Sequence, residues 1–169
     1  MKKIFFIITI TLFSLNSFFA QTKNAVSSTS EPQNVFSKSY DYVNDFEKIL
    51  SPSQIAALKN TLKSCETSSG HKIILVTTPS IKPYSDIPEY SLDLNTYLAN
   101  NLKLNTAVLI VFSKELRQIQ IQGSDQVRNT LNYDETKDII SSYALPEFKK
   151  GDFYKGLEVS VSEIIKKIK

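Results

Sequence analysis

Three acidic side chains are best suited to hold a cation in this chain: Asp45, Glu115 and Asp86. Calcium takes about six to eight oxygen ligands, some of which can be backbone carbonyls or water. Two carboxylates with threonine hydroxyls beside them would therefore make a weak site for Ca²⁺ or another divalent cation. The alternative interpretation is structural: Asp45 caps a turn, and Glu115 pairs locally with Lys114 or Arg117 in a hairpin.

Four other polar residues fit structural roles better than chemical ones. Cys65 is the only cysteine, so no intramolecular disulfide can form, and it lies on the apolar stripe of an expected helix, which predicts a buried thiol. His71, the only histidine, stands where a strand should begin and is expected to be solvated. Asp125 and Asp152 each precede an expected helix, which is the position of a capping carboxylate.

Motifs that would identify a reaction are missing from the sequence. It has no Gly-x-Ser-x-Gly elbow, no Gly-x-x-x-x-Gly-Lys loop, no Cys-x-x-Cys and no pair of histidine ligands. A Ser/His/Asp hydrolase would have to use His71, and no serine motif accompanies it. The residues favour a binding role and leave enzymatic activity an open question.

The elements that must position the acidic residues are organised around residues 106–122. Residues 106–112 form a nearly unbroken apolar run, which predicts a strand covered on both faces of a sheet. Residues 117–122 alternate between polar and apolar side chains, which predicts a strand with one solvated face. Because only residues 113–116 separate the two runs, we expect a hairpin and therefore an antiparallel pair.

The rest of the chain alternates between expected helices and strands. Residues 72–78 read as a second buried strand and residues 42–46 as a short edge strand. Helices are expected over 52–67 and after each of three aspartates: Asp86, Asp134 and Asp152. Each of the last three has an apolar inner face at helical spacing. The residues of these faces are Ile87, Tyr90, Leu94 and Leu98 after Asp86; Ile139, Ile140 and Tyr143 after Asp134; and Leu157, Val161, Ile164, Ile165 and Ile168 after Asp152. Pro146 should break or kink the third of these four helices. This order predicts a three-layer α/β/α sandwich with a mainly parallel sheet and one antiparallel hairpin strand.

The N-terminal region indicates an exported protein. A basic start and an apolar run to residue 19 are typical of a signal peptide, which we expect to be cleaved near Ala20. The alternative is an uncleaved membrane anchor, because Phe18 is bulky for a cleavage site. We expect residues 1–20 to be the signal peptide, 21–40 a flexible linker and 41–169 the domain, in the periplasm or outside the cell.

The charge of the expected mature chain excludes two classes of partner. Without the two lysines of the signal peptide, 18 Lys and Arg stand against 17 Asp and Glu, a net charge of +1. Such a charge generates no field that would attract nucleic acid or an anionic membrane. The expected mature chain also has no second apolar span, so no transmembrane segment is predicted in it.

Five segments in order resemble the TPM domain over Tyr40 to Lys169: VNDFEKILSPSQIAALKNTL, SSGHKIILVTTPS, DIPEYSLDL, NTAVLIVFSKELRQIQIQ and LPEFKKGDFYKGL. The resemblance implies a Rossmann-like sandwich on the outer side of a membrane. It further implies an association with divalent metals, particularly calcium, with weak acid phosphatase activity, or with the assembly or repair of membrane complexes. These associations are diverse, so the family does not fix a reaction.

The sequence also departs from the family pattern. Thr106 stands where members usually carry a glycine, and Glu115-Leu116 stand where two adjacent aspartates often precede the arginine. The glycine-rich turn after the next strand is reduced to residues 123–125, and the usual tryptophan is absent. The lost acid weakens the prediction of a metal site. We expect a binding domain that serves an unidentified envelope or membrane-complex protein as an accessory or assembly factor; the alternative is a metal-assisted acid phosphatase of low activity.

Overall fold

A four-stranded sheet forms the middle layer of the computed structural model, which describes residues 35–169. The strands lie in the order β1 (Val43–Asp45), β2 (Lys72–Thr77), β3 (Thr106–Ser113) and β4 (Gln118–Gly123). β1, β2 and β3 are parallel, and β4 pairs with β3 in the antiparallel direction. The three parallel strands therefore end at one edge of the sheet, which we call the carboxyl edge, and the β3–β4 turn lies there too.

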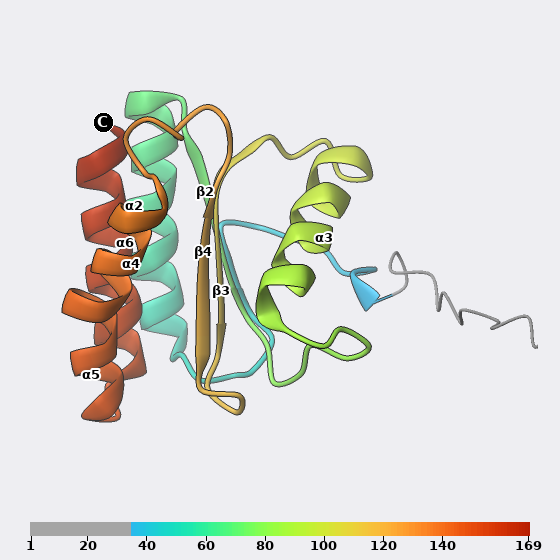
Figure 1. The fold of residues 1–169 in the computed structure, drawn as a ribbon, viewed down its shortest axis with the longest axis vertical. Coiled ribbons are helices and arrows are strands. Elements are labelled where there is room, and N and C mark those ends of the chain that lie inside the picture. The colour runs from blue at the N-terminus through green and yellow to red at the C-terminus, as the bar shows by residue number, and fades with distance from the viewer. Residues whose placement is uncertain (1–34) are drawn as a thin grey trace, which may run out of the picture.

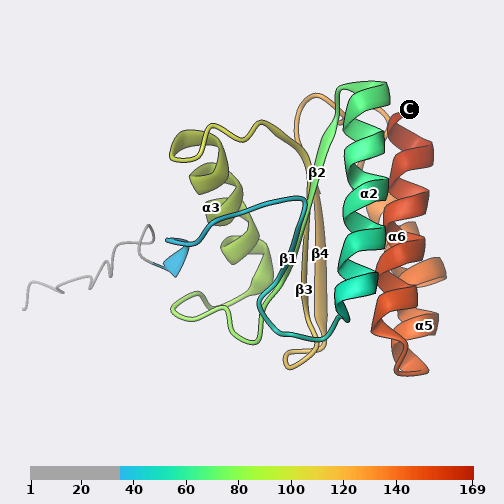
Figure 2. The ribbon, with the colours of Figure 1, turned by 180° about the vertical axis from the view of Figure 1, so that it is seen from behind.

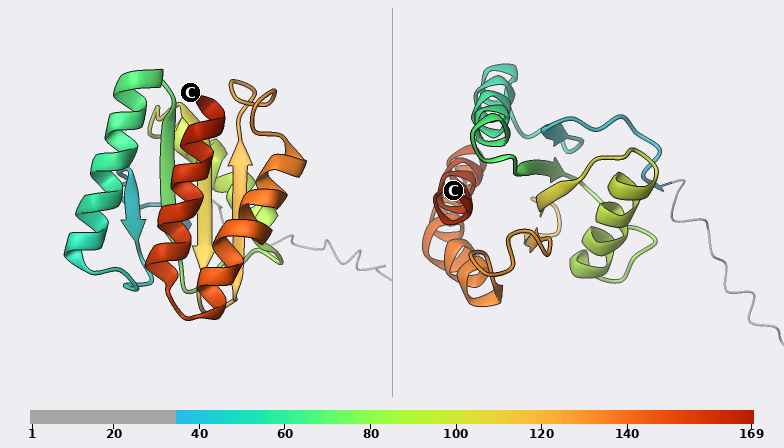
Figure 3. Two further views of the ribbon diagram at one scale, coloured as in Figure 1. Left: turned by 90° about the vertical axis from the view of Figure 1, so that its left-hand side faces the viewer. Right: turned by 90° about the horizontal axis from the view of Figure 1, so that it is seen from above.

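Helices cover both faces of the sheet (Figures 1 and 2). One face carries α3 (Ile87–Asn100) alone. The other carries α2 (Pro52–Ser69), α6 (Phe153–Ile168) and the consecutive segments α4 (Tyr133–Asp138), η1 (Ile139–Ala144, a π-helix) and α5 (Leu145–Lys149). Figure 3 shows the three layers from above. The predicted α/β/α sandwich with one antiparallel hairpin strand is confirmed.

The central strand β3 is buried along its whole length, as its sequence predicts. Its side chains alternate between two cores: Val108, Ile110 and Phe112 join the cluster under α2 and α6, whereas Leu109 and Val111 join the cluster under α3. Helices cover both faces of this strand, so its side chains on either side are removed from water. A continuous apolar run is the sequence pattern that such a strand requires.

Four helix signals in the sequence have the expected geometry. Ser51 and Gln54 form a capping box at the start of α2, and Gly70 ends that helix in the left-handed conformation with φ 75°. Asp86 caps α3 and Asp152 caps α6 through their side chains. The predicted inner faces of α3 and α6 are buried.

The segment from α4 to α5 differs from the expected helix. Asn132 caps α4, so the prediction of Asp134 as the cap was wrong. Tyr143 was predicted to lie inside and is 40% exposed. The helix widens to the π form in η1, which rotates the following residues away from the 3.6-residue period. Pro146 follows this wide turn without ending the helical run, because it lies in the first turn of α5, where a residue without an N–H is tolerated.

The packed domain begins before residue 41. Phe36 lies within the segment for which the sequence predicts a linker, yet only 1% of it is exposed. Its ring contacts those of Tyr84, Tyr90 and Tyr97. The predicted signal peptide and most of the predicted linker lie outside the described residues. None of the helices within residues 35–169 combines the length and apolar character needed to cross a bilayer.

A carboxylate on α2 ties that helix to β1 and β2. Tyr42 Oη donates to Glu66 Oε2 at 2.5 Å, and Lys72 Nζ donates to the same oxygen at 2.8 Å. Burial raises the pKa of Glu66, but the hydrogen bonds from Lys72 and Tyr42 outweigh burial and hold the pKa below its usual range. A carboxyl group whose pKa is lowered by folding stabilises the protein above its unfolded-state pKa of about 4.3 and loses this contribution in acid.

Replacing Glu66→Gln is therefore expected to destabilise the protein at pH 7 and to have little effect once the wild-type carboxyl is protonated. Urea unfolding of both proteins at neutral pH and near pH 3 measures this. A difference in unfolding free energy that stays constant between the two pH values would contradict the assignment.

Candidate binding site at the carboxyl ends of the parallel strands

Asp45, the last residue of β1, holds together the turn that follows it. Its Oδ1 accepts hydrogen bonds from Thr77 Oγ1 at 2.5 Å and from the Ile49 N–H at 3.2 Å. Its Oδ2 accepts from the Leu50 N–H at 2.8 Å. Thr77 is the last residue of β2, so this carboxylate joins the ends of two parallel strands and fixes the loop that leads to α2.

Glu47 continues this network to the β3–β4 turn. Its backbone N–H donates to Thr77 Oγ1 at 3.2 Å, and its carboxylate accepts the backbone N–H groups of Lys114 at 2.9 Å and Glu115 at 2.8 Å. Sequence analysis missed this residue. Its only signal was its place two residues after Asp45, and nothing local indicates a contact with residues 67 and 68 positions away.

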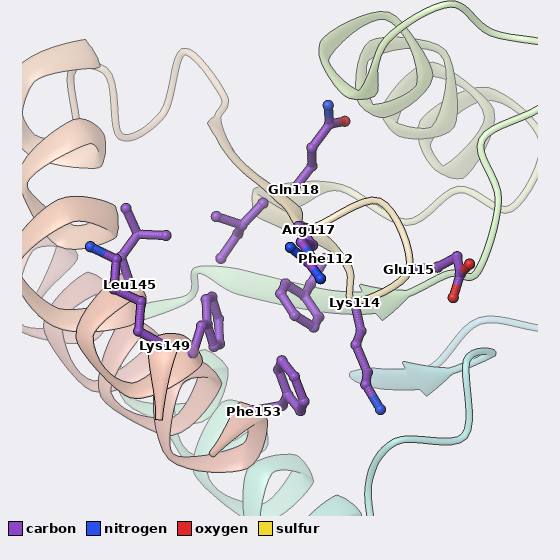
Figure 4. A pocket seen from close by; sticks show the side chains of 10 residues that line it. Phe112, Lys114, Glu115, Arg117, Gln118, Leu145, Lys149 and Phe153 are labelled. Atoms are coloured by element: carbon purple, nitrogen blue, oxygen red, sulfur yellow. The ribbon is translucent and has the colours of Figure 1, made fainter. Parts of the chain in front are cut away.

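The three predicted ligands have different positions. Asp45 and Glu115 lie at the same edge of the sheet and are connected through Thr77 and Glu47. The Glu115 side chain is exposed and points away from the aromatic rings nearby (Figure 4). Asp86 is exposed at the start of α3, where its carboxylate accepts from the Glu89 N–H at 2.8 Å. Within residues 35–169, no hydrogen bond joins Asp86 to the other two.

The donor chemistry at this edge suits a hard cation only weakly. The oxygens of Asp45, Thr77 and Glu115 are of the kind that calcium prefers. However, the described residues include no group of three or more His, Cys, Asp or Glu side chains placed to hold a metal ion. The Asp45 carboxylate also accepts three hydrogen bonds. Any cation held here would need water for most of its ligands.

An open pocket of about 620 Å³ adjoins the turn, between β4 and α5. Three aromatic rings pack together in it: Phe112 lies 4.6 Å from Phe148 and 5.8 Å from Phe153 between ring centroids. Lys114 Nζ lies 5.1 Å from the centre of the Phe153 ring. The remaining lining includes Glu115, Arg117, Gln118 and Lys149 (Figure 4). We call this the basic–aromatic pocket, and its chemistry suits a ligand with both an apolar and an anionic part.

The other polar residues singled out in the sequence have structural surroundings. Cys65 is 2% exposed, as expected for a structural thiol. Asp152 caps α6 by accepting from the Lys155 N–H at 2.9 Å. Asp125 was expected to cap a short helix; it forms an exposed ion pair with Arg128 in a segment of turns. His71 was expected to be solvated and is half-buried, with Nδ1 lacking a hydrogen-bond partner among the described residues.

Comparison with known proteins identifies the family. The chain matches the TPM domain over residues 43–167. No curated protein matches it. Among solved structures, the N-terminal domain of a protein from P. gingivalis is similar, with a TM-score of 0.67, 23% identity, and coverage of 80% of this chain and 86% of that chain.

Two further NMR structures share the fold. The N-terminal domain of cg2496 from Corynebacterium glutamicum has a TM-score of 0.58 and 19% identity, and covers 76% of this chain and 80% of that one. BA42 from the psychrophilic Bizionia argentinensis has a TM-score of 0.56 and 20% identity, with coverage of 72% and 83%. These similarities establish the architecture, and the match over residues 43–167 establishes the family: the chain belongs to the TPM domain family.

Proposed function

We propose that this TPM domain acts by binding, as an accessory or assembly factor for a protein of the cell envelope, to which the predicted signal peptide would deliver it. The observation that carries the proposal is the network at the carboxyl edge. Asp45, Thr77 and Glu47 join the ends of β1 and β2 to the β3–β4 turn. Loops fixed in advance lose little conformational entropy when a partner binds, which favours a recognition surface.

Affinity capture from the envelope fraction tests the accessory role. The wild-type protein should retain a partner in a fixed ratio. A Glu47→Ala variant should lose it, because the β3–β4 turn is no longer tied to the loop after β1. Lys63→Gln on the outer side of α2 is the control and should retain the partner. Equal retention by the Glu47 variant, or the absence of any partner, would contradict the proposed role.

A weak divalent-cation site at Asp45 and Glu115 is the second part of the proposal. The carboxylates of both residues and the Thr77 hydroxyl would supply oxygen ligands for Ca²⁺ or another divalent cation, with water completing the shell. Asp86 is the third predicted ligand. Its carboxylate caps α3, so its contribution can be tested separately from that of the network.

Calorimetric titration of the purified protein with calcium is expected to show weak binding. Glu115→Gln should weaken it by at least about tenfold, since losing even an indirect partner of a metal ligand has effects of this size. Asp125→Asn is the matched control. This exposed carboxylate follows the last residue of β4, at the ends of the strands opposite to the carboxyl edge, and pairs with Arg128. An absence of heat at millimolar calcium would reject the cation site.

A metal-assisted phosphatase of low activity is the alternative function. One observation favours it: Arg117 and Lys149 line the same pocket as Glu115, so a phosphoryl group could be held close to the proposed cation. Calcium- or magnesium-dependent hydrolysis of p-nitrophenyl phosphate, lost in Glu115→Gln and kept in Asp125→Asn, would support this alternative over a pure binding role.

A further inference from the structure

The strand β4 lies at the margin of the sheet, and none of the described strands pairs with its outer side. The Ser124 N–H donates to Ala107 O, one step beyond the pair formed by Val108 and Gly123. In an antiparallel ladder, hydrogen-bonded pairs alternate with pairs that are not hydrogen-bonded. Gln118, Gln120 and Gln122 therefore bond to β3, whereas Ile119 and Ile121 direct their N–H and C=O groups outward.

The sequence of β4 lacks the features that usually protect an edge strand, although Val127 and Leu131 cover its end at Gly123. Proteins commonly guard such strands with lysine, proline, a bulge or a very short length. β4 is six residues long, its sequence is QIQIQG, and its pairing with β3 is regular throughout. By contrast, the strand at the other margin, β1, has three residues. Of the two residues with outward backbone groups, Ile119 is half-buried and Ile121 is only 4% exposed, so the groups of Ile119 are the ones open to pairing with another extended chain.

Two neighbouring pockets lie beside β4. The basic–aromatic pocket includes Gln118 and Ile119 in its lining. A second pocket of about 660 Å³ is lined by residues 120–123 of β4 together with residues of α4 and η1. Leu145 lines both pockets, so they adjoin. Figure 3 shows the orange helical segments beside β4. We call the two pockets together the β4 groove.

The charge of the β4 groove is strongly one-sided, although the expected mature chain carries only +1. Four of its cationic residues form no ion pair within residues 35–169: Lys114, Arg117, Lys137 and Lys149. Arg128 is the fifth and pairs with Asp125, which lies outside the lining. Glu115 is the one acidic residue in either lining. An occupant that complements this charge carries carboxylates.

We propose that the outer edge of β4 binds an extended, acidic segment of a partner protein, which adds to the sheet as a fifth strand. The partner's backbone pairs with Ile119, and its acidic side chains lie beside the lysines and arginines of the β4 groove. A second copy of this chain is a poorer occupant, because two β4 grooves would bring like charges together. This inference rests on the proposed binding function and names the chemistry of the partner.

The backbone of Arg117 supports a role for its charge. This residue adopts φ 55°, in the left-handed region, at the last position of the β3–β4 turn. Glycine, asparagine or aspartate occupy such positions at lower cost than arginine does. Arginine is thus unfavourable for the turn itself, whereas its guanidinium lines the basic–aromatic pocket. Lys48 and Lys103 adopt the same φ of 56°, so it is the place of Arg117 in the pocket lining that supports a role in binding.

A fluorescein-labelled nine-residue peptide of alternating glutamate and valine is the probe, titrated into the purified protein and followed by fluorescence anisotropy. Two companion peptides control for its features: one has lysine in place of glutamate, and one is N-methylated at alternate residues. We expect the acidic peptide to bind at least about tenfold more tightly than either. Loss of even one or two backbone hydrogen bonds has an effect of this size. Amide exchange at Ile119 should slow when it binds.

Three variants separate strand addition from charge attraction. Ile119→Pro removes an outward N–H and should weaken binding by about three- to tenfold, whereas Ile119→Val should not. Arg117→Gly should weaken binding of the acidic peptide by up to about fivefold without lowering the unfolding temperature, because glycine suits φ 55°. Lys63→Gln removes one charge from the outer side of α2 and should have no effect.

Each remaining outcome would overturn the inference. Equal binding of the N-methylated peptide would show that no strand is added, and this test does not depend on whether Ile119→Pro folds. Equal binding of the lysine peptide would remove the charge argument. Concentration-dependent dimerisation that protects the β4 amides, or binding to anionic vesicles in preference to the acidic peptide, would assign the edge to another occupant. Calcium binding with no peptide binding would leave the proposed cation site intact and reject this inference alone.

Discussion

Replacing Asp45→Ala is expected to lower the free energy of unfolding by about 3 kcal/mol. The substitution removes an acceptor of three hydrogen bonds, from Thr77 Oγ1 and from the backbone N–H groups of Ile49 and Leu50. Hydrogen bonds to a charged group contribute about 1.5–3 kcal/mol each, and donors left unpaired in a buried region add a desolvation cost. Partial access of water to this half-buried turn keeps the total well below the sum of those values.

Urea unfolding of the wild type and three variants checks this result. Asp45→Asn keeps the shape of the side chain but places an N–H₂ group against one of the donors, so we expect an intermediate loss. Thr77→Val removes two hydrogen bonds, the one that Thr77 Oγ1 donates to Asp45 and the one that it accepts from the Glu47 N–H, and should cost about 1–3 kcal/mol. Wild-type stability in Asp45→Ala would contradict the assignment of this carboxylate as the link between β1 and β2.

Replacing Gly156→Ala is expected to lower the free energy of unfolding by about 1 kcal/mol and to reshape the basic–aromatic pocket. A Cβ at this position would lie 2.2 Å from Phe148 Cε1 and 3.1 Å from the carbonyl oxygen of Ala144. The Phe148 ring must move, and it packs against Phe112 at 4.6 Å. Overpacking costs about 1–3 kcal/mol and here outweighs the gain of about 1 kcal/mol that alanine brings to a helix.

A double-mutant cycle with Phe148→Ala measures the clash directly. Because removing the ring removes the obstacle, the double variant should be more stable than the sum of the two single changes predicts, by about 1–2 kcal/mol. Thermal unfolding of all four proteins gives the coupling. Simple additivity would show that Gly156 is not required for the position of Phe148.

The strands and the layered architecture could be predicted from sequence because their signals are local and repeated. A few neighbouring residues are enough to predict each element: the apolar run predicts β3, the alternation predicts β4, and the cap at Ser51 predicts the start of α2. The order of these elements then favours a mainly parallel sheet with one antiparallel hairpin over other strand arrangements.

The contacts of the candidate site could be predicted only in part. The sequence identified Asp45 and Glu115 as candidate ligands, and both lie at the edge where the parallel strands end. It could not identify Glu47, whose carboxylate contacts a turn far along the chain. Nor could it predict the left-handed backbone of Arg117, since turn preferences favour other residues there. The π-helix η1 was missed because helical periodicity assumes an unbroken 3.6-residue turn.

An NMR titration of the purified protein with calcium tests the proposed role of the carboxyl edge most directly. We predict amide shifts confined to the turn over residues 45–50, the end of β2 at residues 77–78 and the β3–β4 turn over residues 113–117, with these shifts lost in Glu115→Gln. Shifts confined to other parts of the domain, or none up to millimolar calcium, would contradict a cation site at this edge.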